Sequence, residues 1–298
     1  MESPLHITVF RERVIELIAP RGGGLYVDVT LGLGGHSEAI LEASQPDGRV
    51  VCIDRDPTAI ARSKARLARF GDRAEFHHAT MSSVRSVLDG RLVDGLVADL
   101  GVSSPQLDEP ERGMSFRAEG PLDMRMDLDG EVTAWSLVRD LRESDLADVI
   151  YQYGEERRSR PIARSIKRAI EAGEMETTKQ LASAIYRVMG PPRFGTLDPA
   201  TRTFQALRIA VNDELGELDK LLAAVPDVLA DGGVAAIISF HSLEDRKVKH
   251  AFRDADALEV MTKKPIEPGD DECRENPRAR SAKLRAARRA VRDGEEEA

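Results

Sequence analysis

A glycine-rich loop and an aspartate that follows it are the residues of this chain whose types and spacing suggest chemistry. The loop, Gly32-Leu33-Gly34-Gly35-His36, follows the apolar run Tyr26 to Val29, and a second apolar run, Val50 to Ile53, ends at Asp54. Glycines belong where the backbone takes positive φ or approaches a ligand closely, and the helix start behind them offers N–H groups. Asp54 stands where nucleotide-binding βαβ units place the carboxylate that holds ribose hydroxyls. The stretch predicts a site for a ribose-containing ligand.

The spacing of the glycines narrows the choice of ligand. Their order is G-x-G-G, without the G-x-G-x-x-G spacing of dinucleotide sites, so a pyrophosphate cofactor is disfavoured. S-adenosylmethionine has a ribose and an adenine but no phosphate, so it needs the acidic residue and close backbone approach more than a phosphate-binding helix end. We therefore expect S-adenosylmethionine. The alternative that these glycines only shape a βα turn stays open at this point.

The elements around this loop alternate between strand and helix patterns. Strands are predicted at Tyr26 to Val29, Val50 to Ile53, Ala74 to His77 and Val93 to Leu100, with helical stretches between them. This order predicts a parallel sheet with right-handed crossovers, whose ligands lie at the carboxyl ends of the strands. Those ends carry Asp28, Asp54, the His77 to Met81 loop and Asp99.

A long helical segment interrupts the predicted sheet. After Asp99 come a turn-rich loop and several amphipathic helical patterns, the last a long helix behind Asp198-Pro199 that continues to Val225. The next strand, Val234 to Phe240, resumes the sheet, and Ser281 to Val291 reads as a strand or a helix. We therefore predict a discontinuous domain of residues 1–107 and 208–298 and an inserted helical domain of residues 108–207.

Composition limits the class of protein. Hydrophobic residues make up 41% and charged residues 32% of 298 residues, and the longest apolar run, Val234 to Phe240, is too short to cross a bilayer. Cys52 and Cys273 give neither a disulfide framework nor a zinc set, and the histidines lack metal-ligand spacing. We expect a cytoplasmic protein without a membrane partner or metal, and a disordered terminal run, Glu295 to Glu297.

Charge is distributed unevenly along the chain. The formal net charge is −9, which argues against nonspecific coating of nucleic acid. Residues Arg157 to Arg168, however, include six basic side chains and no acidic one, and Arg274 to Arg292 include eight basic side chains with Glu275 as the only acid. Each run alone is compatible with a solvated helix face. Together they indicate a surface for a polyanion.

With these residues laid out, the sequence resembles the bacterial 16S ribosomal RNA cytosine-N4 methyltransferases. The motifs that carry the resemblance run nearly from end to end; they are GGHS at 34–37, IDRDP at 53–57, DLGVSSPQLD at 99–108, RGMSFRAEGPLDMRMD at 112–127, YGEE at 153–156, ATRTFQALRIAVNDEL at 200–215, ISFHSLEDR at 238–246 and NPRARSAKLR at 276–285. The resemblance implies an α/β fold, with a Rossmann-like S-adenosylmethionine-dependent methyltransferase sheet and an inserted all-helical substrate domain. It also implies methyl transfer to the N4 amine of a cytidine in the decoding region of small-subunit RNA.

The resemblance implies roles for individual residues. Gly34, Gly35 and His36 would wrap the methionine part of the cofactor, and Asp54 would accept from the ribose hydroxyls. Met81 would lie against the adenine, Asp99 near the sulfonium or the adenine amine, and Gln106 would close the pocket. Asp99 is also the candidate proton acceptor. The candidates for RNA binding are Arg278, Arg280, Lys283 and Arg285.

Two positions depart from the family pattern. Thr8 replaces the usual proline, and Met81 stands where an aromatic residue is common, so plain core packing is an alternative for Met81. No cysteine is placed for attack on the pyrimidine ring, which favours attack by the amine nitrogen. The partner would be small-subunit RNA or the assembled 30S particle, and the chain would act as a monomer or a homodimer.

Three other functions remain open at this point. A nicotinamide-dependent oxidoreductase would use the same βαβ unit, although the G-x-G-G loop and the lack of a hydride-transfer constellation disfavour it. A ribosome-assembly factor could keep the cofactor only as a structural ligand. A DNA amino-methyltransferase is the third, although the SSPQ loop beside Asp99 lacks the Asp/Asn-Pro-Pro-aromatic motif of that class.

Overall fold

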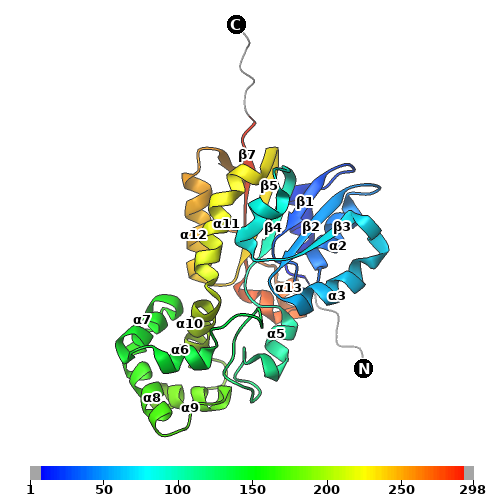
Figure 1. Cartoon of the computed structure of the whole chain (residues 1–298). Coiled ribbons are helices and arrows are strands. Elements are labelled where there is room, and N and C mark those ends of the chain that lie inside the picture. The colour runs from blue at the N-terminus through cyan, green and yellow to red at the C-terminus, as the bar shows by residue number, and fades with distance from the viewer. Residues whose placement is uncertain (1–7, 292–298) are drawn as a thin grey trace. The chain divides into compact units, whose positions relative to one another are not determined.

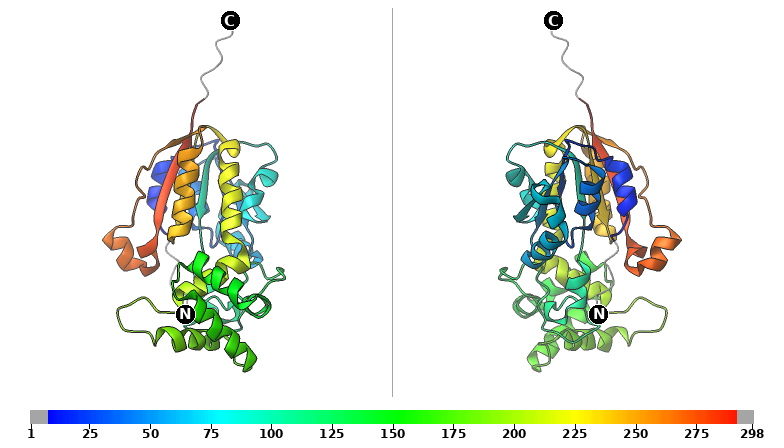
Figure 2. Two further views of the ribbon diagram at one scale, coloured as in Figure 1. Left: turned by 90° about the vertical axis from the view of Figure 1, so that its left-hand side faces the viewer. Right: turned by 90° about the vertical axis from the view of Figure 1, so that its right-hand side faces the viewer.

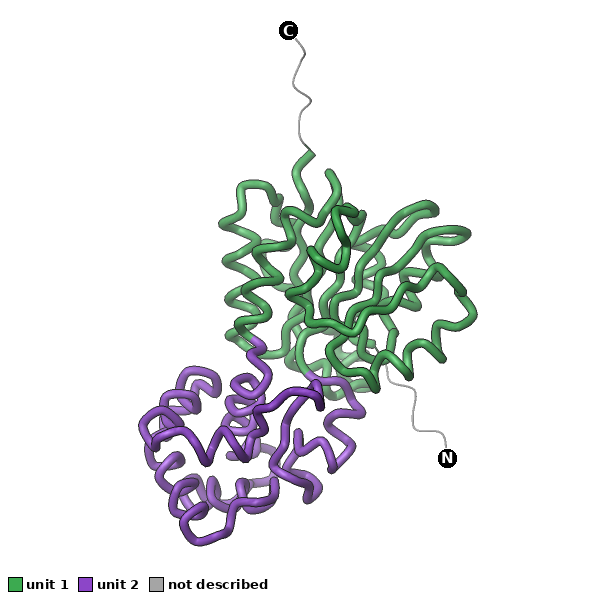
Figure 3. Tube along the Cα trace, in the orientation of Figure 1, with its two compact units in different colours: residues 1–101, 215–298 green, residues 102–214 purple. Residues whose placement is uncertain are grey.

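The structure, a computed structural model, describes residues 8–291. It divides into two compact units, one of Met1–Gly101 with Leu215–Ala298 and one of Val102–Glu214 (Figure 3). These boundaries lie at 101/102 and 214/215, outside the predicted 107/108 and 207/208, because the second unit also includes a short capped helix at its start and a whole helix at its end. Arg292 and the Glu295 to Glu297 run lie outside the described residues.

A seven-stranded sheet forms the centre of the first unit (Figure 1). Its order is β3-β2-β1-β4-β5-β7-β6; the first five strands of this row are parallel, and β7 is antiparallel to both neighbours. All five strands predicted for the parallel part are present, so the α/β prediction is confirmed. The bounds are β1 (Leu25–Asp28), β2 (Arg49–Asp54), β3 (Ala74–His78), β4 (Val93–Asp99), β5 (Leu229–Ser239), β6 (Leu258–Val260) and β7 (Lys283–Arg289).

Helices cover both faces of this sheet. Side chains alternate between the faces along each strand, and here the strands carry apolar side chains on both faces, so each face must be covered. Val27, Val51 and Leu96 pack with α4, α11 and α12, whereas Tyr26 and Val50 pack with α1, α2 and α3 on the other face. Figure 2 shows α11 and α12 in front in one view and α1 in front in the opposite view. The bounds are α1 (Arg11–Ile18), α2 (Gly35–Ala43), α3 (Pro57–Leu67), α4 (Val84–Leu88), α11 (Glu214–Val228), α12 (Ser242–Asp254) and α13 (Asp270–Glu275).

The second unit is helical and has its own hydrophobic core. Buried side chains of its five longer helices form one cluster, in which the rings of Phe116 and Phe204 meet edge to face with centroids 4.9 Å apart. None of the helices within residues 8–291 combines the length and apolar character that a membrane span requires. The bounds are α5 (Ser104–Asp108), α6 (Ala134–Asp140), α7 (Glu143–Gly154), α8 (Ser159–Glu171), α9 (Thr178–Met189) and α10 (Thr201–Asn212).

The prediction of a single long helix behind Asp198-Pro199 is wrong. The segment forms two helices, α10 and α11, separated by Asp213 in the left-handed conformation with φ 48°. Aspartate tolerates this conformation better than most residues, so the chain can turn here without a glycine. The apolar pattern continues across the break because the apolar residues of α10 pack in the core of the second unit and those of α11 pack in the core of the first.

The segment Ser281 to Val291, which the sequence predicted as a strand or a helix, contains strand β7. Within β7, Arg285 is 6% exposed, and its Nε donates to Asp245 Oδ1 of α12 at 2.7 Å. Lys283 Nζ lies 3.7 Å from the same carboxylate. A buried guanidinium requires such a partner, so the pair fixes α12 against the antiparallel part of the sheet.

This pair gives a test of the sheet edge. Asp245→Ala leaves Arg285 charged, buried and without its carboxylate, so we expect the free energy of unfolding to fall by about 3 kcal/mol. Asp254→Ala, on the same helix, removes only an exposed pair with Arg253 and should leave the unfolding midpoint unchanged. Urea unfolding followed by circular dichroism measures both. Equal midpoints for the two variants would contradict this account.

Candidate functional site

Three aspartates lie at the carboxyl ends of neighbouring strands. Asp28 ends β1, Asp54 ends β2 and Asp99 ends β4, and β1 pairs with both other strands. Strands β1 and β4 are neighbours although β2 and β3 lie between them in sequence, so the crossovers leave this point in opposite directions. Ligands of open α/β sheets bind in the crevice at such a switch point.

Asp28 is almost fully buried, at 1% exposure. Its Oδ2 accepts from Ser37 Oγ at 2.7 Å, and its Oδ1 accepts from the Thr30 backbone N at 3.2 Å. Burial raises the pKa of this carboxyl to about 6 despite both hydrogen bonds. Asp28 thus holds the start of α2 against the end of β1.

The glycine loop has the backbone conformation expected from its sequence. Gly32 has φ 51° and Gly34 has φ 76°, values that favour glycine, and Gly34 is the N-cap of α2. A Cβ on Gly35 would lie 1.8 Å from Thr8 Oγ1, so any side chain at position 35 would have to displace the side chain of Thr8. Because the first N–H groups of a helix lack intrahelical partners, α2 presents donors at this end.

Asp54 fastens the loop to the end of β2. Its Oδ2 accepts from Gly32 N at 2.7 Å, and its Oδ1 accepts from Asp56 N at 2.8 Å. Each carboxylate oxygen can accept a second hydrogen bond, so both retain capacity for a pair of adjacent hydroxyls. Burial raises the pKa of Asp54, with the two backbone hydrogen bonds opposing the shift.

Asp99, at the end of β4, has a strongly raised pKa. Its side chain is 23% exposed, its Oδ2 lies 3.8 Å from His36 Nε2, and its Oδ1 has no hydrogen-bond partner within residues 8–291. Burial, and after it the negative charges of Asp28 and Glu244, raise the pKa of Asp99 to about 8. A carboxyl in this environment is suited to a cationic or hydrogen-donating ligand.

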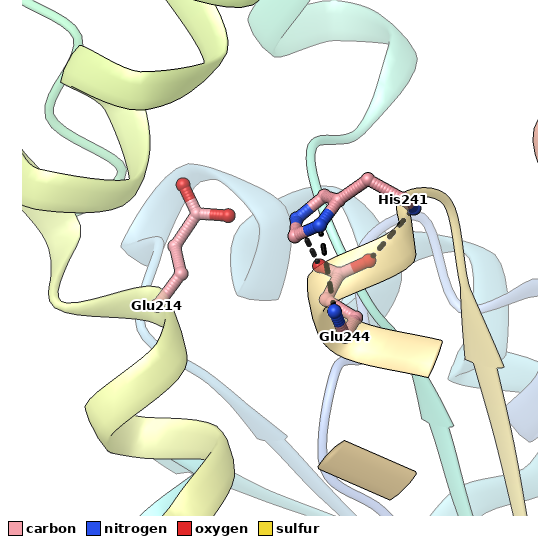
Figure 4. Close-up of side chains that lie close together, drawn as sticks. All are labelled: Glu214, His241 and Glu244. Atoms are coloured by element: carbon pink, nitrogen blue, oxygen red, sulfur yellow. Dashed lines mark hydrogen bonds and ion pairs between the residues drawn. The ribbon is translucent and has the colours of Figure 1, made fainter. Parts of the chain in front are cut away.

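Sequence reasoning did not assign a role to the residues that follow β5. His241 is the N-cap of α12, and Glu244 completes a capping box by accepting from the backbone N of Phe240 at 2.9 Å and of His241 at 3.3 Å (Figure 4). The ring Nε2 of His241 lies 3.1 Å from Glu244 Oε1, and both side chains are buried. The His-x-x-Glu spacing after an apolar run was the signal that could have identified this negative group beside Asp99.

The predicted cofactor contacts of Met81 and Gln106 stay predictions. Met81 begins a 3-10 turn after β3, and its half-buried side chain packs on the core beneath α4, consistent with the alternative of core packing. Gln106 belongs to the other unit, where its Oε1 accepts from Ser103 N at 3.0 Å in the capping box of α5. The structure thus groups Gly34, Gly35, His36, Asp54 and Asp99 at one sheet edge.

The four basic candidates for RNA binding do not form one exposed group. Arg280 is exposed and Arg278 is half-buried in the 3-10 turn Pro277–Ser281. Arg285 must be removed from the set, because its guanidinium is buried and bound to Asp245. Strand β7 is covered on both faces, so residues 284–287 are all buried, which the charge run alone did not reveal.

The geometry selects for a particular ligand chemistry. Two carboxyls with raised pKa values, Asp28 and Asp99, lie at the strand ends and would repel phosphate, whereas a cation there would lower the cost of ionising them. Asp54 and the glycine loop add a hydroxyl acceptor and close backbone approach. The site therefore fits a cationic nucleoside better than a pyrophosphate cofactor.

Comparisons with known proteins agree with this chemistry. A model of the MraW methylase family matches residues 3–290. The ribosomal RNA small subunit methyltransferase H of Sorangium cellulosum is 57% identical over 287 residues, which cover 95% of this chain and 90% of that protein. Its counterparts from Synechococcus elongatus and Cyanothece sp. are 52% and 50% identical, each covering 96% of this chain and 95% of the relative. This chain belongs to the MraW methylase family.

Proposed function

We propose that this protein transfers a methyl group from S-adenosylmethionine to the N4 amine of a cytidine in the decoding region of small-subunit ribosomal RNA. The observation that carries the proposal is the group of Asp28, Asp54 and Asp99 around the glycine loop, in a chain of a methylase family. The names of its relatives, ribosomal RNA small subunit methyltransferase H, support RNA as the substrate class. We propose that it acts in the cytoplasm, where ribosomal subunits form.

S-adenosylmethionine fits the residues of this edge. When bound, it supplies an electrophilic methyl group on a positively charged sulfur. Asp54 has acceptor capacity for the two ribose hydroxyls, and the N–H groups at the start of α2 are suited to a carboxylate. The unpartnered Oδ1 of Asp99 would face positive charge or a donor N–H.

The cytosine amine, which accepts the methyl group, needs help from the protein to react. A cytosine amine is a poor nucleophile because its lone pair is delocalised into the ring, so catalysis requires positioning and an acceptor for the amine protons. Asp99 is our candidate acceptor, since its carboxyl lies at the strand end and its pKa is raised to about 8. Attack on the ring by the Cys52 thiol is disfavoured, because this side chain is fully buried and burial raises the pKa of its thiol.

One experiment tests this function directly. Small-subunit RNA and assembled 30S particles are incubated with the protein and isotopically labelled S-adenosylmethionine, and their nucleosides are analysed by mass spectrometry. We expect labelled N4-methylcytidine. Label in C5-methylcytosine, or label only in a DNA control, would overturn the proposal. Cofactor binding without any transfer would indicate a ribosome-assembly factor instead.

Asp54 provides the first site-directed prediction. Asp54→Ala removes two charge-assisted hydrogen bonds to the ribose, each worth about 1.5–3 kcal/mol, so the affinity for S-adenosylmethionine should fall at least about tenfold. Calorimetry measures it, and circular dichroism checks that the variant is folded. Asp72→Ala, which removes an exposed carboxylate, is the matched control and should bind normally. Unchanged affinity in folded Asp54→Ala would exclude Asp54 from the site.

The raised pKa of Asp99 predicts how binding depends on pH. A cationic ligand binds the ionised carboxylate better, so affinity for S-adenosylmethionine should rise with pH until about 8, by at most about tenfold per pH unit. Asp99→Asn has no proton to lose and should show a smaller rise. The amino group of the ligand titrates equally in both proteins, so the difference between their calorimetric profiles isolates Asp99. Identical profiles would place Asp99 away from the positive charge.

A further inference from the structure

A group of exposed arginines stands at one end of the second unit. Arg157 and Arg158 precede α8, Arg160 lies in its first turn, and all three are exposed. The opposite side of α8 is apolar and buried through Ile162 and Ile166, so the helix is held in place by its core face. We call the group of Arg157, Arg158, Arg160 and Arg202 the arginine patch.

Contacts within the unit bring Arg202 to the same place. Arg202, at the start of α10, donates from Nη1 to the backbone O of Glu155 at 3.4 Å and lies 4.0 Å from Glu156 Oε2. A Cβ on Gly154 would lie 2.6 Å from the Arg202 backbone O, so α7 and α10 meet here without room for a side chain. The start of α10 therefore adjoins the residues that lead into α8.

Within the described part of the chain, three of the four arginines of the patch, Arg157, Arg158 and Arg160, lack the carboxylate partners that other arginines of this unit have; Arg202 has only a long contact with Glu156, at 4.0 Å. Arg139, Arg142 and Arg187 each pair with a neighbouring acid at 2.6 to 2.8 Å. Within residues 8–291, the guanidinium groups of Arg157, Arg158 and Arg160 form no ion pair. Two acids adjoin the patch: Glu155 is exposed, and the buried Glu156 accepts from Arg158 N at 2.8 Å and lies 4.0 Å from Arg202. The four arginines outnumber these two acids, so the patch keeps a net positive charge.

The loop that enters α10 adds an exposed aromatic side chain. Phe194 is 109% exposed and Leu197 is 65% exposed, while the end of the loop is anchored by Asp198, which accepts from Tyr186 OH at 3.0 Å. The loop enters α10 two residues before Arg202 and also carries the exposed Arg193. An exposed phenylalanine next to an arginine offers an aromatic face for stacking and a positive charge, which an unpaired nucleotide can use together.

We propose that the arginine patch and the Phe194 loop form a docking surface for unpaired nucleotides of ribosomal RNA. Arginine guanidinium groups bind phosphates, and an aromatic face stacks on a base that is out of its helix. The whole chain carries a formal charge of −9, so a polyanion needs a local basic surface of this kind to approach it. The inference rests on the proposed function for its substrate class.

The test compares two changes of different character with a matched control. Arg157→Gln with Arg160→Gln should weaken binding to a small-subunit RNA transcript and make the slope of log affinity against log salt shallower by about 1.4, at about 0.7 per phosphate contact. Phe194→Ala should weaken binding roughly fivefold to 100-fold with the slope unchanged. Arg139→Gln with Arg142→Gln removes two paired arginines of the same unit and should change neither quantity.

The outcomes separate this surface from the proposed function. Filter binding gives the RNA affinities, calorimetry should show normal S-adenosylmethionine affinity in every variant, and sedimentation should show an unchanged oligomeric state. Three outcomes would each overturn the docking surface. They are wild-type RNA affinity in both the Arg157→Gln/Arg160→Gln variant and the Phe194→Ala variant, an equal loss of RNA affinity in the control, and a loss that follows a change in self-association. Arginine-dependent RNA binding without formation of N4-methylcytidine would retain the surface and overturn the proposed function alone.

Discussion

The meeting of β1 and β4 in the middle of the sheet is the constraint on which the site depends. Because β2 lies on one side of β1 and β5 lies on the other side of β4, the crossovers leave the two strands in opposite directions, which is where open α/β sheets bind their ligands. Asp28 and Asp99 occupy those ends, and the glycine loop begins beside them. The buried alternating side chains on both faces hold this register, since a shift by one residue would turn each aspartate to the other face.

Asp28 and Asp99 lie where ionising their carboxyls costs free energy. Burial is the main cause that raises the pKa of Asp28 to about 6 and that of Asp99 to about 8; the charge of Asp54 adds to the first shift, and the charges of Asp28 and Glu244 add to the second. A core designed only for stability would neutralise such groups with a basic partner. A cationic cofactor would instead favour the ionised carboxylates, so part of the free energy that ionisation costs in the protein alone would be recovered when the cofactor binds.

The acidic edge also explains why basic residues stand elsewhere in the chain. Aspartates that favour a cation repel a polyanion, so RNA recognition requires a separate surface. The arginine patch belongs to the second unit, which has an independent core, while the three aspartates belong to the first. An insertion after β4 achieves this separation without interrupting the sheet, because β5 still pairs in parallel with β4.

The sequence by itself determined the parallel strands, the glycine loop and the aspartates at the strand ends, because these depend on local periodicity and on residues adjacent to an apolar run. Tertiary structure decided the rest. The break at Asp213 occurs inside a continuous apolar pattern, and only the existence of two separate cores accounts for it. Arg285 looked like its basic neighbours, yet pairing of β7 with β5 turned it toward Asp245. The raised pKa of Asp99 arises from charges distant in sequence, and residue spacing alone carries no information about such distances.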